Sequence, residues 1–221
     1  MAAYLIIFSM ATKFGLITEG PTDQVIIKNV LARFISPDIA TLPVQPNTDS
    51  TDKADHFGGW GRVLGYCKSA DMLAVIEVND FVIIQMDTDV CEEYGVQKRV
   101  AGNDLTSDEI VQKTKELIIE NIGRELYAAY KHKIIFAISH ESIECWLMPL
   151  YYNDNRRTKT TNCCETLNQE LTKKGFTLDC DNKNPYYYKK ICKEIKNKAQ
   201  IENIAVHNNS FNQFIQQLPK I

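Results

Sequence analysis

The sequence has no C-x-x-C pair, no large excess of charge of one sign and no hydrophobic run long enough to cross a bilayer. Its seven cysteines are an odd number, and we expect neither a disulfide framework nor a zinc ribbon. The 25 basic side chains nearly balance the 28 acidic ones, which excludes a uniformly basic nucleic-acid-binding chain. Low-complexity tracts and internal repeats are also missing. With 44% hydrophobic residues over 221 positions, the chain is typical of a globular protein with a substantial core.

The apolar residues 4–10 are too few for a membrane span and lack the positive flank of a signal peptide. They indicate either a packed N-terminal strand or a loose extension ahead of an initiator at Met10. We therefore expect a cytoplasmic protein with no membrane partner.

Charge is unevenly distributed along the chain. Residues 1–153 carry 13 basic and 21 acidic groups, whereas residues 154–200 carry 11 basic and 6 acidic groups. This change predicts a catalytic domain over 1–153 and a helical, basic C-terminal extension over 154–221 that packs on it. Solvated surface faces would give the same distribution.

Short apolar runs alternate with segments of helical periodicity. Strands are expected near 13–18, 41–44, 81–86 and 133–138, and helices near 22–34, 62–78, 107–131 and 139–151. Thr22 is expected to cap the first helix, and Ser210 with Gln213 a C-terminal one. The alternation predicts an α/β fold with a mostly parallel, Rossmann-like sheet flanked by helices.

Three acidic residues follow predicted strands: Glu19 after the first, and Asp87 and Asp89 after the strand at 81–86. Functional groups of parallel sheets collect beyond the carboxyl ends of the strands. Alternation along the extended backbone places Asp87 and Asp89 on one side, where carboxylates suit Mg²⁺ or Mn²⁺. The alternative is that these acids only cap turns and helix N-termini.

These two segments, Gly15-Leu-Ile-Thr-Glu19-Gly20-Pro-Thr-Asp23 and Val82-Ile-Ile-Gln-Met-Asp87-Thr-Asp89, together resemble the Toprim domain of topoisomerases, primases and OLD-family nucleases. The Glu-Gly-x-Thr-Asp form is most similar to OLD-type and small stand-alone bacterial Toprim proteins, many of them linked to phage defence. The stretch Ser139–Leu147 and the Asn209-Ser210-Phe211 segment also resemble parts of those stand-alone proteins. The core of the resemblance covers residues 13–150.

The resemblance implies a Toprim-like sheet and a metal-dependent nuclease acting on DNA or RNA. Asp87 and Asp89 would bind the metal, and Glu19 would bind it or relay a proton. No tyrosine-nucleophile domain is recognisable, which favours hydrolysis over strand passage. The ATPase module of full-length OLD nucleases is also missing, so a partner ATPase is a candidate partner, as is a second copy of the chain.

Two further acids are candidate metal ligands, Asp23 and Glu144. Asp23 would equally serve as a favourable charge in the first turn of its helix. In a helix over 139–151, His140 and Glu144 would share one face, with His140 as a helix-end residue.

Basic residues interleaved with aromatics follow Tyr186 and are typical of phosphate contacts and base stacking. The candidate nucleic-acid-binding residues are Lys189, Lys190, Lys193, Arg156 and Arg157. The alternative is a core stripe of Tyr187, Ile191 and Ile195 with solvated lysines.

Other functions remain open. An apolar strand ending in Asp87-Thr-Asp89 also fits the nucleophile motif of haloacid-dehalogenase-like phosphatases, although their later paired acidic motif is missing. A ligase-like or primase-like nucleotidyl transferase is another enzymatic option. A different class is a non-catalytic adaptor that senses nucleic acid or nucleotides.

Overall fold

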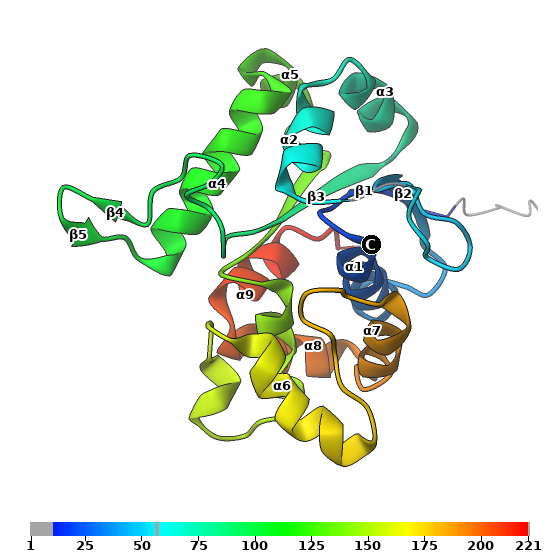
Figure 1. Ribbon diagram of the computed structural model, residues 1–221. Helices are drawn as coiled ribbons and strands as arrows, with labels where there is room; N and C mark the ends of the chain where they lie inside the picture. The colour runs from blue at the N-terminus through cyan, green and yellow to red at the C-terminus, as the bar shows by residue number, and fades with distance from the viewer. Residues whose placement is uncertain (1–10, 56–57, 221) are drawn as a thin grey trace, which may run out of the picture.

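The computed structural model describes residues 11–55 and 58–220, and a four-stranded parallel sheet lies at its centre (Figure 1). The strands are β1 (Lys13–Ile17), β2 (Ala40–Gln45), β3 (Phe81–Asp87) and β6 (Ile134–Ser139), in the order β2-β1-β3-β6. All three strand pairs are parallel. This confirms the expected α/β class with a parallel sheet between helices. The strand considered at 4–10 lies outside the described residues.

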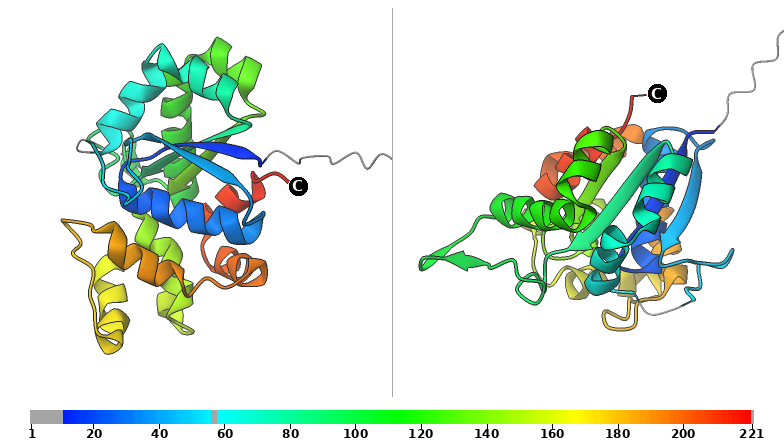
Figure 2. Two further views of the ribbon diagram at one scale, coloured as in Figure 1. Left: turned by 90° about the vertical axis from the view of Figure 1, so that its right-hand side faces the viewer. Right: turned by 90° about the horizontal axis from the view of Figure 1, so that it is seen from above.

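Side chains of the central strands alternate between two apolar clusters, one on each face of the sheet. Ile83 of β3 packs into one cluster, and its neighbours Val82 and Ile84 pack into the other. All three are fully buried. The two views of Figure 2 show helices on both sides of the sheet, which gives a three-layer molecule.

One face is covered by α2 (Trp60–Lys68), α3 (Asp71–Val78), α4 (Ser107–Ile122) and α5 (Arg124–Tyr130). The other is covered by α1 (Pro21–Phe34), α6 (Cys163–Leu171), α7 (Pro185–Cys192), α8 (Lys198–His207), α9 (Asn209–Gln216) and the 3₁₀ helix η1 (Ile143–Leu150). Shorter 3₁₀ turns are η2 (Asn155–Thr158) and η3 (Thr172–Lys174). The hairpin of β4 (Arg99–Val100) and β5 (Asn103–Asp104) extends away from the body (Figure 1).

Three of the predicted helices differ from those in the structure. The helix predicted over 62–78 is two helices that break at Ser69 and Ala70. The helix predicted over 107–131 is interrupted at Gly123, whose φ of 90° is incompatible with a continuous α-helix. The helix predicted over 139–151 is a 3₁₀ helix that begins only at Ile143, so His140 and Glu144 do not share a helix face. Glu141 has a φ of 59° and forms the turn before it.

Two predicted helix caps are also wrong. Gly20 is the N-cap of α1, and Thr22 lies inside the first turn, because Pro21 already occupies the first helical position. Asn208 caps α9 by accepting a hydrogen bond from Phe211 N at 3.0 Å. Ser210 instead accepts the indole N–H of Trp146 at 2.9 Å, so its hydroxyl fixes the core rather than the helix end.

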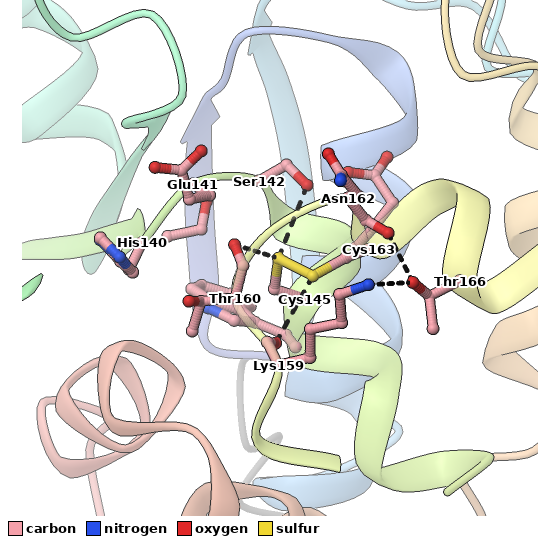
Figure 3. The surroundings of a disulfide bond; sticks show 12 residues. His140, Glu141, Ser142, Cys145, Lys159, Thr160, Asn162, Cys163 and Thr166 are labelled. Carbon is pink, nitrogen blue, oxygen red and sulfur yellow. Dashed lines mark hydrogen bonds between the residues drawn. A yellow bond between two sulfur atoms is a disulfide. The ribbon is translucent and has the colours of Figure 1, made fainter. Parts of the chain in front are cut away.

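Four cysteines form two disulfides, which corrects the expectation of no disulfide framework. Cys145 pairs with Cys163, and Cys164 pairs with Cys180. Figure 3 shows the first bridge between η1 and the start of α6. Sequence spacing did not reveal the pairs because the packing of η1 against α6 brings Cα atoms 18 positions apart to 5.1 Å. Cys67, Cys91 and Cys192 are free and buried.

Helix α9 and the residue that follows it close the β6 edge of the sheet. The side-chain amide of Gln217 both accepts from Phe136 N and donates to Phe136 O, each at 3.0 Å, and so covers β6. One apolar cluster extends from Phe14 of β1 to Leu218 after α9. The division at residue 153 stays a prediction. No helix in the described part of the chain is long and apolar enough to cross a membrane.

Candidate active site

The carboxyl ends of β1 and β3 meet where the order of the sheet reverses. The chain passes from β1 through α1 to β2 on one side, whereas β3 lies on the other side of β1. Ligands of open α/β sheets bind at such a point. Glu19 follows β1, and Asp87 is the last residue of β3. A carboxylate oxygen of Glu19 accepts a hydrogen bond from Asp87 N at 2.8 Å, so the two predicted site residues are neighbours.

Gln85 and Ser139 orient this pair. The Gln85 side chain accepts from Glu19 N at 3.0 Å and donates to Asp87 Oδ1 at 2.8 Å. The Ser139 hydroxyl, at the end of β6, donates to the same Asp87 oxygen. Gln85, Asp87 and Ser139 are all buried. These two hydrogen bonds to one buried oxygen hold the Asp87 carboxylate in one position.

Glycines make room around Glu19. A side chain at Gly58 would place its Cβ 1.7 Å from the Glu19 carbonyl oxygen, so only glycine fits there. The next residue, Gly59, donates its N–H to that oxygen at 2.7 Å with a φ of 104°. A Cβ at Gly20 would lie 3.2 Å from the carboxylate of Asp23. The Glu-Gly dipeptide therefore lets the first turn of α1 approach the end of β1 closely.

Two further predicted acids, Asp23 and Glu144, are buried and interact with Lys183. Their exposed fractions are 3% and 1%. The Lys183 ammonium lies 2.8 Å from Glu144 Oε1, and Tyr188 donates its hydroxyl to the same oxygen. Asp23 Oδ1 has no hydrogen-bond partner. An unpaired buried carboxylate oxygen is costly, so this oxygen is suited to accept from a donor or to bind a cation.

Burial dominates the electrostatics of the cluster. It raises the pKa of Glu19 to about 8, against the hydrogen bond from Asp87 N–H that lowers it. Burial likewise raises the pKa of Asp23 to about 7 and that of Asp87 well above its usual range, despite the opposing charge of Lys183. Burial would also raise the pKa of Glu144, but the Lys183 ammonium and the hydrogen bonds to it and Tyr188 hold that pKa below its usual value. The charge of Lys183 thus lowers the pKa of several carboxylates and is paired directly with that of Glu144.

Asp89 lies outside the hydrogen bonds of this network, although its charge contributes to the raised pKa of Glu19. It is exposed, and its carboxylate accepts a hydrogen bond from the N–H of Val90 at 2.8 Å. The Lys98 ammonium donates to the Asp89 carbonyl oxygen at 2.9 Å and pairs with Glu141 at 3.1 Å. β3 ends at Asp87, so the extended alternation expected for Asp87 and Asp89 does not continue to Asp89.

The donor set has the chemistry of a site for a hard divalent cation, since it consists of carboxylate oxygens and includes the unpartnered Asp23 Oδ1. Across residues 11–55 and 58–220, however, no three His, Cys, Asp or Glu side chains are arranged so that they could hold a metal ion. Lys183 supplies the nearby positive charge, and a cation that used Glu144 would compete with it.

The predicted nucleic-acid-binding residues lie on the face that carries α6 and α7. Lys189 pairs with Asp52 at 2.6 Å, and the Lys190 ammonium lies 4.7 Å from the ring centroid of Tyr186. Lys193 is exposed. Arg156 pairs with Asp154 and lies over the ring of Tyr152, while Arg157 is half-buried. Their contact with nucleic acid stays a prediction.

Sequence reasoning missed Gln85, Ser139, Lys183 and the Gly58-Gly59 pair. A glutamine inside the apolar run Val82–Met86 was a signal for Gln85, and Ser139 directly follows the apolar run expected as a strand near 133–138. Lys183 lies in a polar loop with no distinguishing pattern.

Comparison with family models, with curated proteins and with solved structures finds no match to this chain.

Proposed function

We propose that the protein is a metal-dependent nuclease that hydrolyses phosphodiester bonds of DNA or RNA at the acid cluster. The observation that carries this proposal is the convergence of Glu19 and Asp87 at the reversal point of a parallel sheet, linked by a 2.8 Å hydrogen bond. The resemblance of both segments to Toprim sequences supports the same chemistry. It also supports a role in phage defence with a partner ATPase. A second copy of the chain is a further candidate partner, and the cytoplasm is the location that the sequence predicts.

In this proposal Mg²⁺ or Mn²⁺ would be held by Glu19, Asp87 and Asp89, with Asp23 and Glu144 as further ligands. The described residues do not bring three of these side chains together as they stand, so binding would require them to move. Such a cation, when bound, polarises a phosphate and lowers the pKa of an attacking water. Binding requires deprotonated carboxylates, and their raised pKa values mean that protons compete with the metal below neutral pH.

The chain's own residues have separable tasks in this proposal. Gln85 and Ser139 hold Asp87 in place, and the Asp87 N–H holds the Glu19 carboxylate. With a pKa of about 8, Glu19 gains or loses a proton near neutral pH and is suited to relay one. The Lys183 ammonium can contact a phosphate only when its ion pair with Glu144 is broken. Its charge would then stabilise the negative phosphate oxygens.

The test is cleavage of plasmid, linear duplex, single-stranded DNA and RNA with Mg²⁺, Mn²⁺ or chelator. We expect metal-dependent cleavage that Asp87→Asn and Glu19→Gln abolish without unfolding the protein. The matched control is Glu116→Gln, an exposed acid on α4, which should cleave like the wild type. Cleavage that persists in chelator, or in both site variants, would contradict the proposal.

A specific observation favours a second candidate, a non-catalytic nucleic-acid-sensing adaptor. Lys183 neutralises Glu144 inside the cluster, and the described residues contain no group of three metal-binding side chains. An adaptor would bind nucleic acid equally well in chelator and cleave none of the substrates. The same experiment separates the two functions.

A further inference from the structure

We infer that a cavity beside the acid cluster binds one unpaired nucleotide, so that the preferred ligand is single-stranded nucleic acid rather than a continuous duplex. The inference names the substrate class of the proposed function and rests on it. The cavity has a volume of about 700 Å³, within the range of small-ligand sites. Its walls come from residues 51–53, from Gly58 and from residues 181–186 and 189.

The cavity adjoins the acids through two of its own lining residues. Lys183 lines it and contacts Glu144 with its ammonium. Gly58 lines it too, and it lies against the Glu19 carbonyl oxygen. A nucleotide in this cavity would therefore have its backbone beside the carboxylates proposed to act on it.

Tyr186 supplies an aromatic surface at the rim. It is 58% exposed, and the other large hydrophobic side chains that are exposed in the described residues are aliphatic. Its ring meets Tyr187 edge-on at 5.3 Å between centroids, and Tyr187 in turn stacks on Phe176 at 5.8 Å. The Lys190 ammonium also lies over the Tyr186 ring, 4.7 Å from its centroid. A tyrosine held in this way is rigid, so a base can stack on the exposed part of its ring at small entropic cost.

Polar and charged groups complete a nucleotide-binding set. Lys53 is exposed and offers an ammonium to a phosphate. Asn184 caps α7 by accepting a hydrogen bond from Tyr186 N at 3.0 Å, which leaves its side-chain NH₂ as a donor to a sugar or base edge. Lys189 also lines the cavity, but Asp52 holds it at 2.6 Å and reduces its charge. The lining includes Asp52 and Asp181, so the net positive charge is small and stacking must contribute much of the affinity.

Single-stranded selectivity follows from the position of Tyr186. A paired base keeps its faces stacked on its neighbours and offers none to the tyrosine ring, whereas an unpaired base offers both. A cavity of about 700 Å³ also accepts a single nucleotide more readily than a rigid duplex.

The experiment measures the binding of fluorescein-labelled single-stranded decathymidylate and of a labelled ten-base-pair duplex by anisotropy in chelator. Wild-type protein should bind the single strand at least tenfold more tightly. Tyr186→Ala should weaken single-strand binding by about 5- to 150-fold, which corresponds to a stacked base worth about 1–3 kcal/mol. Tyr186→Phe should restore it, and duplex binding should not change.

A second pair of variants tests the phosphate contact. Lys53→Ala should reduce the slope of log affinity against log salt by about one, while Lys113→Ala on α4 should leave it unchanged. The inference would be overturned if wild type and Tyr186→Ala bound the single strand equally well. It would also be overturned if wild type bound the duplex as tightly as the single strand. Tyr186-dependent binding without any metal-dependent cleavage would support this inference and contradict the proposed nuclease, and cleavage that is indifferent to Tyr186 would do the reverse.

Discussion

Lys183 places its ammonium 2.8 Å from Glu144 Oε1, although the lysine comes from a surface loop and the glutamate is 1% exposed. Glu19, Asp23 and Asp87 belong to the same electrostatic cluster, and burial raises the pKa of each. The lysine is the internal positive charge of the cluster, and this relationship leads to the first prediction.

Replacing Lys183 by Met should destabilise the metal-free protein, because it leaves the buried Glu144 carboxylate unpaired. Removing one partner of a buried ion pair costs about 3–5 kcal/mol. Mg²⁺ or Mn²⁺ should then raise the melting temperature of Lys183→Met more than that of wild type, since the cation no longer competes with the ammonium. Thermal unfolding with metal and with chelator measures both effects.

The control is Lys174→Met, which removes a surface ion pair with Glu194 and should change stability by only about 0–1 kcal/mol. A Lys183→Met protein as stable as this control would show that the ion pair has no such role. If Mg²⁺ and Mn²⁺ change the melting temperature of neither wild type nor Lys183→Met, this would argue against a cation site.

Stability of the metal-free protein should fall as the pH rises through neutrality. The pKa of Glu19 is raised from 4.5 to about 8 and that of Asp23 from 3.8 to about 7, so the folded state holds these protons more tightly than the unfolded state. Their contribution is complete below pH 4 and is lost between about pH 4 and 8, at up to about 1.4 kcal/mol per pH unit for each group. Urea unfolding from pH 5 to 9 in chelator measures the slope.

In Glu19→Gln the pH dependence above pH 5 should be smaller, because one of the titrating groups is gone. The outcome that contradicts this prediction is a slope identical to that of wild type.

Gly58→Ala should disrupt the site, whereas Gly61→Ala should not. The new Cβ at position 58 would collide with the Glu19 carbonyl oxygen, while position 61 has no neighbouring atom within 4 Å. Gly61 lies inside α2, where alanine stabilises a helix by about 0.5–1 kcal/mol. The melting temperature from circular dichroism and the affinity for single-stranded DNA should both be lower for Gly58→Ala than for Gly61→Ala. The prediction is wrong if the two variants behave alike.

Three cysteines should react with an alkylating agent in denaturant without reductant, and all seven after reduction. Mass spectrometry counts the added groups, and peptide mapping should find Cys145 joined to Cys163 and Cys164 joined to Cys180. Reduction should lower the free energy of unfolding, because each bridge restricts the unfolded chain. The bridged cysteines are 18 and 16 positions apart, and a loop of about 15 residues is expected to contribute about 3 kcal/mol. Seven reactive thiols in freshly isolated protein would show that the bridges are open in the cell.

Much of the architecture could be predicted because it depends on local patterns. The apolar run at 81–86 is a central strand buried on both faces, and acids that follow two strands of a parallel sheet lie at the same edge. Glu19 meets Asp87 because β1 and β3 are also neighbours in the sheet. The helix breaks are harder to predict, since Gly123 and the Ser69-Ala70 junction interrupt otherwise continuous periodicity.

The part that could not be predicted depends on contacts between distant segments. Lys183 resembles any loop lysine until α7 packs against α1 and brings its loop beside Asp23. Gly58 and Gly59 resemble turn glycines until their loop meets the end of β1. Asp89 seemed equivalent to Asp87, but the strand ends between them, and only a structure shows where pairing stops.

The two disulfides shorten the covalent path from Glu144 to Lys183. It leads from Cys145 to Cys163, on to the adjacent Cys164, across to Cys180 and along the chain to Lys183, which avoids most of the main chain between the two residues. A short tether keeps the effective concentration of the ammonium at the carboxylate high even when η1 and α6 loosen. Reduction would lengthen the covalent path between the ammonium and the carboxylate to the whole main chain from Glu144 to Lys183, so the two disulfides favour re-formation of this ion pair after each local opening.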